Sequence, residues 1–307
     1  MFLQSLRMKS LLILALTACF GMRAAEPTSV SGLQYQTITV PDVTYLKVGG
    51  LELKLDVYTP ANQLGEEPWV RFTQARKPTL LYIHGGGWNS LTRTVRNLNL
   101  LPFIQRGWAV VNIDYRLVSQ ASLPACIADC RQALNWIYEN ADNYKFDTSR
   151  VVVSGESAGG HLALMTGFLA GDDVIQIEGH PIPRPLRVAA IINWYGVSDL
   201  DRLMKGWNSE DTVKLMVGDL SQKQRLFQLC SPLNHVTSTV PPVITIHGDR
   251  DAVVPLEQAT LLHAALNKAQ VKNRLLTVKG RKHGDFNDKE LGDVYGEIWK
   301  FLKEAGI

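Results

Sequence analysis

The sequence around Ser157 is typical of a nucleophilic serine. Ser157 lies at the centre of Gly155-Glu156-Ser157-Ala158-Gly159, after an apolar run at 150–154 and before a helical pattern over 158–170. A strand that turns sharply into a helix crowds the backbone against its neighbours, so a Cβ at either glycine would clash. Such a turn lifts the serine hydroxyl above the sheet. It also places the amide of Ala158 at a helix N-terminus, facing any negative charge that develops there.

A glycine run supplies bare backbone amides that could bind such a charge. His84-Gly85-Gly86-Gly87-Trp88 follows the apolar residues of a predicted strand at 79–84. We expect the amides of Gly86 and Gly87 to form an oxyanion hole together with the amide of Ala158. A phosphate-binding loop would instead need Lys and Ser or Thr after the glycines. Trp88 and Asn89 stand there, so the sequence favours the oxyanion hole.

A serine becomes a nucleophile only beside a base, and two histidines compete for that role. Both follow the acidic candidates, as the order serine, acid, histidine requires. His263 falls inside a predicted amphipathic helix at 257–268, where a structural histidine is the safer interpretation. His283 falls in the loop after a predicted strand at 274–278, where a base belongs, so we expect His283 to serve.

The acid that orients this base has three candidates. Asp249 and Asp251 follow the predicted strand 242–247, and Asp199 follows the strand before it. We favour Asp251, and we expect Asp249 to brace the turn through backbone amides. The carboxylate would hold His283 in the tautomer whose free nitrogen faces the serine.

The elements that position these residues alternate along the chain. Several predicted strands are nearly continuous apolar runs, as in a parallel sheet covered by helices on both faces. From residue 79 onward, strand and helix alternate, which predicts one α/β domain, and the first two strands look like an antiparallel edge. The predicted strands are 35–40, 51–58, 79–84, 108–114, 150–154, 188–194, 242–247 and 274–278, and the predicted helices are 93–106, 124–141, 158–170, 257–268 and 288–304.

Three segments interrupt this alternation and could contribute binding loops. They are residues 61–78, 172–187 and 201–236, the last with a possible helix pair. Insertions after strands often carry lids and binding residues. Trp69 and Trp207 lie in two of these segments, and Trp88 lies in the glycine run. All three could form aromatic walls for a sugar or a phenolic ring, and the alternative is that they are core residues.

The first 25 residues have the pattern of an export signal. Two basic residues precede a short apolar run at 11–18, which is shorter than the roughly 20 residues that cross a bilayer. Leu16-Thr17-Ala18-Cys19 resembles a lipobox, which would attach a lipid to Cys19, whereas Ala24-Ala25 could mark ordinary cleavage. Either processing predicts an exported protein with a single domain over 26–307. The destination would be the periplasm, the exterior or, through Cys19, the outer membrane.

Composition excludes several other classes of protein. The 307 residues are 46% hydrophobic and 20% charged, which excludes a disordered chain, a fibrous repeat and a coiled coil. The basic residues of the first 25 positions account for the whole net charge of +3, so the remainder has no electrostatic footprint for nucleic acid. Cys126, Cys130 and Cys230 do not form a disulfide framework, and we interpret Cys126 and Cys130 as small core residues. No Cys–His spacing resembles a zinc site. We expect no metal or other cofactor.

With these pieces placed, the chain resembles the α/β-hydrolase superfamily, in the esterase and lipase branch with the HGGG loop. It is most similar to secreted carbohydrate acetyl and feruloyl esterases. The matching segments are His84–Trp88, Asp114–Leu117, Ser154–Ala163, His247–Pro255 and His283-Gly284. The resemblance implies a mostly parallel sheet of about eight strands covered by helices on both faces. It also implies Ser157 as nucleophile, Asp251 as acid and His283 as base.

The resemblance implies a function and leaves two alternatives. The expected protein is a cofactor-free serine esterase that removes acetyl or feruloyl groups from plant polysaccharide through an acyl-enzyme. Its partner would be a small ester or an acylated carbohydrate, with a membrane involved only if Cys19 is lipidated. The loop His84–Trp88 also resembles that of kynurenine formamidases, which keeps an amide substrate open. A non-catalytic binding module of the same fold is the other alternative.

Overall fold

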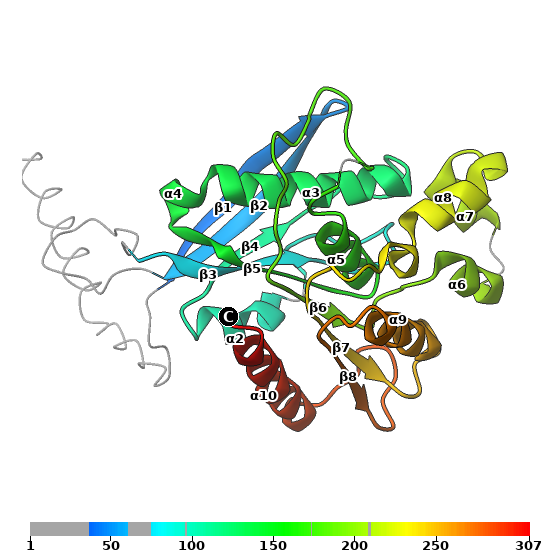
Figure 1. Cartoon of the computed structure of the whole chain (residues 1–307). Helices are drawn as coiled ribbons and strands as arrows, with labels where there is room; N and C mark the ends of the chain where they lie inside the picture. The colour runs from blue at the N-terminus through cyan, green and yellow to red at the C-terminus, as the bar shows by residue number, and fades with distance from the viewer. Residues whose placement is uncertain (1–36, 61–74, 96, 173, 208–209) are drawn as a thin grey trace, which may run out of the picture. The chain divides into compact units, whose positions relative to one another are not determined.

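One mixed sheet organises the computed structural model, which describes residues 37–60, 75–95, 97–172, 174–207 and 210–307. The strand order is β1-β2-β4-β3-β5-β6-β7-β8, in which β2 runs antiparallel to both of its neighbours, β1 and β4, and all the other pairs are parallel (Figure 1). This confirms the predicted antiparallel edge and the mostly parallel sheet. The strands are β1 Thr37–Val48, β2 Leu51–Pro60, β3 Lys77–Ile83, β4 Ala109–Ile113, β5 Phe146–Glu156, β6 Ala190–Trp194, β7 Val243–Gly248 and β8 Asn273–Val278.

The central strands are apolar on both faces because both faces are covered. Every residue of β4 and β6 is buried. In β3 the side chains of Leu81 and Ile83 enter one core, and those of Leu80 and Tyr82 enter the other. A strand with two buried faces needs continuous apolar residues, and this is the pattern that the sequence displays.

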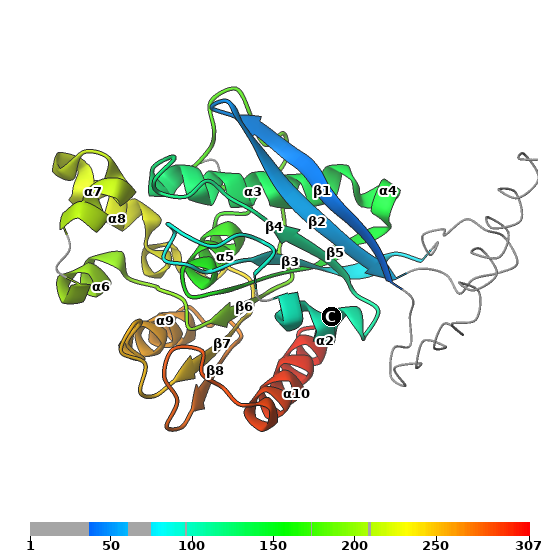
Figure 2. The same ribbon diagram turned by 180° about the vertical axis from the view of Figure 1, so that it is seen from behind.

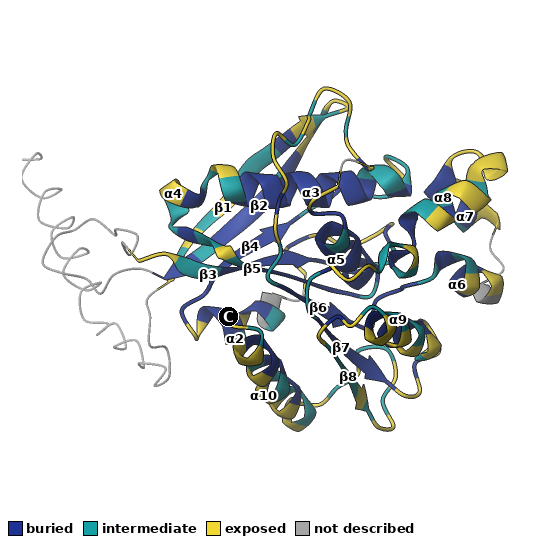
Figure 3. Ribbon diagram, viewed as in Figure 1, coloured by how far each residue is buried: buried dark blue, intermediate teal, exposed yellow. Residues whose placement is uncertain are grey.

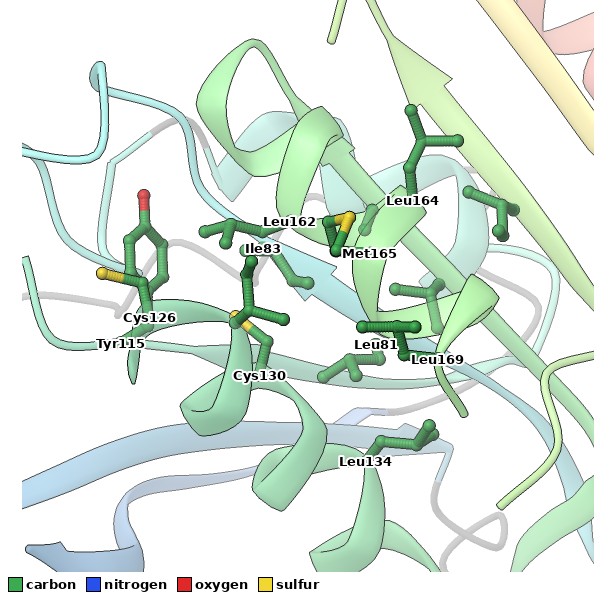
Figure 4. Close-up of a cluster of buried hydrophobic side chains, with 14 of the residues drawn as sticks. Leu81, Ile83, Tyr115, Cys126, Cys130, Leu134, Leu162, Leu164, Met165 and Leu169 are labelled. Atoms are coloured by element: carbon green, nitrogen blue, oxygen red, sulfur yellow. The ribbon is translucent and has the colours of Figure 1, made fainter. Parts of the chain in front are cut away.

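One face of the sheet packs against helices α3 (Leu123–Glu139), α5 (Ala158–Phe168) and α9 (Glu257–Lys268). Figure 4 shows part of this core, in which Leu81 and Ile83 of β3, Leu162 of α5, and Cys126 and Cys130 of α3 belong to one cluster. Both cysteines are buried free thiols, as is Cys230. The cysteines therefore act as small core residues.

The other face packs against α10 (Asp288–Glu304) and the short α2 (Leu101–Ile104), seen from behind in Figure 2. The prediction of one helix over 93–106 is wrong at its start, because helical turns begin only at Asn97. The side chain of Arg93 is buried among the carboxylates of Asp42, Asp56 and Asp114, and its amide donates to Asp114 at 2.8 Å. These long-range bonds override the local helical pattern.

The insertion between β6 and β7, predicted as residues 201–236, is largely helical. It contains α6 (Leu200–Trp207), α7 (Glu210–Val217) and α8 (Lys223–Cys230), which Figure 1 shows grouped at one end of the sheet. The sequence indicated a helix pair here, and the insertion has a third helix. Figure 3 shows that exposed residues gather on the outer side of these helices, whereas the strands are buried.

Short helical segments complete the described chain, namely α4 (Ala141–Tyr144) and the 3₁₀ turns Asn97–Leu100, Leu220–Gln222 and Pro232–His235. Among the described residues, no helix has both the length and the apolarity that crossing a bilayer requires. The predicted leader at 1–25, with Cys19, and the first interruption up to residue 74 lie outside the described residues.

Candidate active site

The turn from β5 into α5 holds Ser157 in a strained conformation. Its φ of +55° is unusual for a residue with a side chain. The Ser157 amide donates to the carbonyl of Trp194 at 2.8 Å, which fixes the turn against β6. A Cβ on Gly155 would lie 2.3 Å from the Gly159 carbonyl oxygen, and one on Gly159 would lie 2.2 Å from that of Ile83. The two glycines are therefore required by close backbone contact.

Three side chains from distant parts of the chain meet at this turn. The Nε2 atom of His283 lies 2.9 Å from Ser157 Oγ, and its Nδ1 atom lies 2.6 Å from Asp251 Oδ2. A carboxylate only accepts, so Nδ1 carries the hydrogen and Nε2 is free to accept from the serine hydroxyl. The tautomer that the carboxylate requires is thus the one in which His283 can act as a base.

The other acidic candidates do not contact the imidazole. Asp249 Oδ1 accepts the amide of Gly280 at 2.6 Å and so braces the loop, as the sequence suggested. Asp199 accepts the amide of Arg202 at the start of α6. Of the two competing histidines, His263 bonds to Asn273 at 2.7 Å within its own part of the fold.

Asp251 is buried and strongly hydrogen-bonded. Burial raises the pKa of this carboxyl, but hydrogen bonds from His247, His283 and the Val254 amide outweigh it and hold the pKa well below its usual range. The amides of Val253 and Val254 both donate to Oδ1 at 2.9 Å. Asp251 is therefore an anion held in one orientation, with Oδ2 aimed at His283.

His247 is a neighbour of the acid to which the sequence analysis gave no role. Its Nε2 atom lies 2.7 Å from the Val254 carbonyl oxygen and 3.4 Å from Asp251 Oδ2, and its side chain is fully buried. His247 is the penultimate residue of β7, just before the acidic loop. That position is the one signal that could have indicated its role.

Tyr195 packs against His283, and the sequence analysis gave this tyrosine no role. Its ring meets the ring of His283 edge-on, with centroids 4.6 Å apart. Its hydroxyl donates to Glu156 Oε2 at 2.9 Å. A Cβ on Gly284 would lie 2.6 Å from the Tyr195 hydroxyl, so the loop that carries the base lies directly on this ring.

The glycine loop, residues 84–88, lies against the turn that carries Ser157, and backbone N–H groups in this region have no acceptor within the described protein. A Cβ on Gly85 would be 3.5 Å from the Ser157 Cβ. Gly86 (φ +102°) turns its carbonyl toward the amides of Asn89 and Ser90, each at 3.1 Å, which directs the Gly87 N–H the opposite way. Within the described part of the chain, the amides of Gly86, Gly87 and Ala158 donate to no protein acceptor.

The expectation of an aromatic wall at Trp88 is wrong. Trp88 is only 1% exposed, and its indole N–H donates to His161 Nδ1 at 3.1 Å. It is a core residue because the apolar space between the loop and α5 encloses the whole ring. Trp69 and the side chain of Trp207 lie outside the described residues.

This geometry is suited to one class of chemistry. A hydroxyl, a base in the right tautomer and a buried acid stand in line beside amides that can bind an oxyanion, as nucleophilic acyl transfer requires. A cavity of about 590 Å³, lined by Phe168, Arg187 and Thr237 among others, lies at the far end of α5 from Ser157 and has no part in this arrangement.

Comparison with known proteins finds that the chain is similar to esterases. Esterase LipC from Mycobacterium tuberculosis is 28% identical over 267 residues, which cover 80% of this chain and 64% of LipC. The chain thus spans less than two thirds of that relative's length. Among solved structures, Thermogutta terrifontis esterase 2, phosphoramylated by tabun, has a TM-score of 0.72 and 26% identity, covering 87% of this chain and 95% of that one.

A truncated carbohydrate esterase from gut microbiota shares the fold, with a TM-score of 0.70 and 24% identity over 88% of this chain and 98% of that one. The BD-FAE family model matches residues 55–266, from β2 through most of α9. That span includes Ser157, Asp251 and the glycine loop. The chain therefore belongs to the BD-FAE family.

Proposed function

We propose that this protein is a serine carboxylic-ester hydrolase that works through an acyl-enzyme. The observation that carries the proposal is the pair of contacts made by one imidazole, 2.9 Å to Ser157 Oγ and 2.6 Å to Asp251 Oδ2. Membership of a family of esterases supports it.

The proposed reaction has two stages. Ser157 Oγ attacks the ester carbonyl carbon while His283 Nε2 takes the hydroxyl proton. The amides of Gly86, Gly87 and Ala158 stabilise the oxyanion. His283 then returns the proton to the leaving alcohol, and an acyl group remains on Ser157. Water attacks that acyl group by the same route, which releases the acid and restores the serine.

Asp251 would act by orientation and charge. It holds His283 in the tautomer with a free Nε2, and its negative charge stabilises the imidazolium that forms when the serine proton moves. Its low pKa keeps it ionised across the working range of pH. The carboxylate itself need not accept a proton at any stage.

The proposed substrates are acetyl or feruloyl esters of plant polysaccharide, met outside the cytoplasm. Family membership supports this class, and a protein of the same fold is described as a carbohydrate esterase. The apolar run after two basic residues at the N-terminus supports export. Mass spectrometry of the mature chain tests export and processing. Loss of a fatty-acid label in Cys19→Ser would identify a lipoprotein, whereas an N-terminus at Glu26 would identify ordinary cleavage.

The decisive test combines a covalent probe with a substrate panel. A fluorophosphonate should label the wild type, fail to label Ser157→Ala and still label Ser149→Ala, which changes an exposed serine at the opposite end of β5. Hydrolysis of p-nitrophenyl acetate, butyrate and octanoate and of methyl ferulate then defines the acyl group. Acetate or ferulate release from xylan tests the carbohydrate.

Two results would contradict the proposal. A wild-type protein that neither reacts with the probe nor cleaves any ester would be a binding module of this fold. Release of formate from N-formylkynurenine, with no ester cleaved, would make it an amide hydrolase instead.

A further inference from the structure

Gly87, one of the amides proposed to bind the oxyanion, has no packing of its own. A Cβ placed on it would meet nothing within 4 Å, and its φ is +60°. Its position therefore depends on the residues to either side. Gly86 is held by its carbonyl, which accepts from Asn89 and Ser90. On the other side the loop depends on Trp88.

Trp88 fastens the loop to two other parts of the fold. Its backbone, with φ +59°, accepts the amide of Val118 at 2.9 Å. Its indole N–H crosses to helix α5 and donates to His161 Nδ1 at 3.1 Å, with the two rings edge-on at 87°. This is a polar contact inside an otherwise apolar core, since Trp88 is 1% exposed and His161 fully buried.

Only one state of His161 satisfies both of its contacts. Its Nε2 atom lies 2.7 Å from the carbonyl of Cys230, which only accepts, so Nε2 carries the hydrogen. Nδ1 then has a free lone pair, which the indole N–H of Trp88 requires. Burial lowers the pKa of His161 to about 4, so the ring is neutral near pH 7. A protonated His161 would face the indole with a second donor.

His161 is also tied to the nucleophile. It stands one turn after Ser157 in α5, and its amide donates to the Ser157 carbonyl at 3.0 Å. One residue therefore contacts the backbone of the strained serine and the side chain that anchors the glycine loop.

We infer that His161 is a positioning residue for the proposed hydrolysis: by accepting the Trp88 indole N–H, it holds the Gly86 and Gly87 amides at the point where the oxyanion forms. This inference rests on the proposed function and adds a residue to it. His161 touches neither substrate nor the reacting atoms. Its effect should fall on the transition state, where the oxyanion exists, and little on the binding of the ester.

Two substitutions at the same position separate the two bonds of His161. In His161→Asn the amide oxygen can take the place of Nδ1 and accept from Trp88, while the bond to Cys230 is lost. In His161→Gln the amide nitrogen can take the place of Nε2 and donate to Cys230, while the acceptor for Trp88 is lost. Trp88→Phe removes the indole N–H and keeps an aromatic ring. Trp136→Phe is the matched control, because Trp136 packs against Tyr144 and Phe146, far from the glycine loop.

The measurements are kcat and KM for p-nitrophenyl acetate, with active sites counted by fluorophosphonate titration so that misfolded protein does not count. The inhibition constant of a trifluoromethyl ketone, which forms a tetrahedral oxyanion on serine, is measured beside them. Losing an oxyanion donor outright lowers kcat about 10²–10³-fold. We therefore expect a displaced donor in Trp88→Phe and His161→Gln to lower kcat about 10–100-fold, with KM little changed and the ketone weakened in parallel.

His161→Asn and Trp136→Phe should stay within a few-fold of the wild type. The double variant Trp88→Phe/His161→Gln should be no worse than either single variant, because both remove the same bond. If Trp88→Phe does not fold, the contrast between His161→Asn and His161→Gln decides the matter alone.

The inference is overturned if Trp88→Phe and His161→Gln keep wild-type kcat per titrated site. It is also overturned if they raise KM rather than lower kcat, or if His161→Asn loses as much kcat as His161→Gln. Any of these outcomes with an active wild type leaves the proposed esterase intact. An inactive wild type that the probe does not label refutes the proposed function instead, and this inference with it.

Discussion

Replacing Asp251 by asparagine tests the proposed site most sharply, because the structure dictates how the new side chain must lie. The amides of Val253 and Val254 donate to Oδ1, so the asparagine amide oxygen must take that position. The amide nitrogen is then placed 2.6 Å from His283 Nδ1, where the carboxylate oxygen was. Two donors cannot face each other, so His283 must move its hydrogen to Nε2.

That change of tautomer removes the base. Nε2–H would point at Ser157 Oγ with no lone pair to accept the serine proton. A carboxylate-to-amide change at such a triad lowers kcat about 10⁴-fold, which is about 5.5 kcal/mol of transition-state stabilisation. We expect a loss of this size in Asp251→Asn, measured with p-nitrophenyl acetate against enzyme of verified fold.

The two other acidic candidates are the matched controls. Asp249→Asn keeps an oxygen to accept the Gly280 amide, and Asp199→Asn keeps one for Arg202. Both should stay within a few-fold of wild type. The reasoning is refuted if Asp251→Asn retains a tenth or more of the wild-type kcat, or if Asp249→Asn loses as much.

Further predictions concern stability and thiol chemistry. The pKa of His161 is about 4 in the folded protein and about 6.5 when unfolded, so the unfolded chain takes up the extra proton between these values. The free energy of unfolding should therefore fall about 2–3 kcal/mol more in wild type than in His161→Asn as the pH drops from 7 to 4.5, and equal slopes in urea titrations would contradict this. Gly292→Ala, in open space on α10, should stabilise by about 0.5–1 kcal/mol with activity unchanged, visible as a higher Tm. Gly159→Ala, whose Cβ would lie 2.2 Å from the Ile83 carbonyl oxygen, should yield no active protein. Burial raises the pKa of the Cys230 thiol to about 12, so Ellman's reagent should not modify it until the chain unfolds.

Local signals explain how much of the site could be predicted from the sequence. Gly155 and Gly159 around Ser157, and Gly85 and Gly86 of the glycine loop, are needed by close backbone contacts within a few residues of a strand end, so their spacing is visible in the sequence. The two-sided burial of β4 and β6 likewise leaves continuous apolar runs. His283 could be assigned because its position after a strand distinguished it from a histidine within a helix.

Long-range contacts explain what the sequence did not reveal. The indole of Trp88 bonds to a residue 73 positions away, and the hydroxyl of Tyr195 to one 39 positions away. Nothing in either local segment indicates such a partner. At Arg93 the local sequence was misleading. Its segment has a helical pattern, but ion pairs with three distant carboxylates hold it in a different conformation.

The strain at Ser157 explains why so much of the site lies at the C-terminal ends of the strands and in the first turn of α5. A non-glycine residue with positive φ costs about 1–3 kcal/mol and persists only where its surroundings oppose relaxation. Here the opposing contacts are the bond from the Ser157 amide to β6, the bond from His161 to the Ser157 carbonyl, and the close packing of Gly155 and Gly159. These contacts place the attacking oxygen before any substrate arrives.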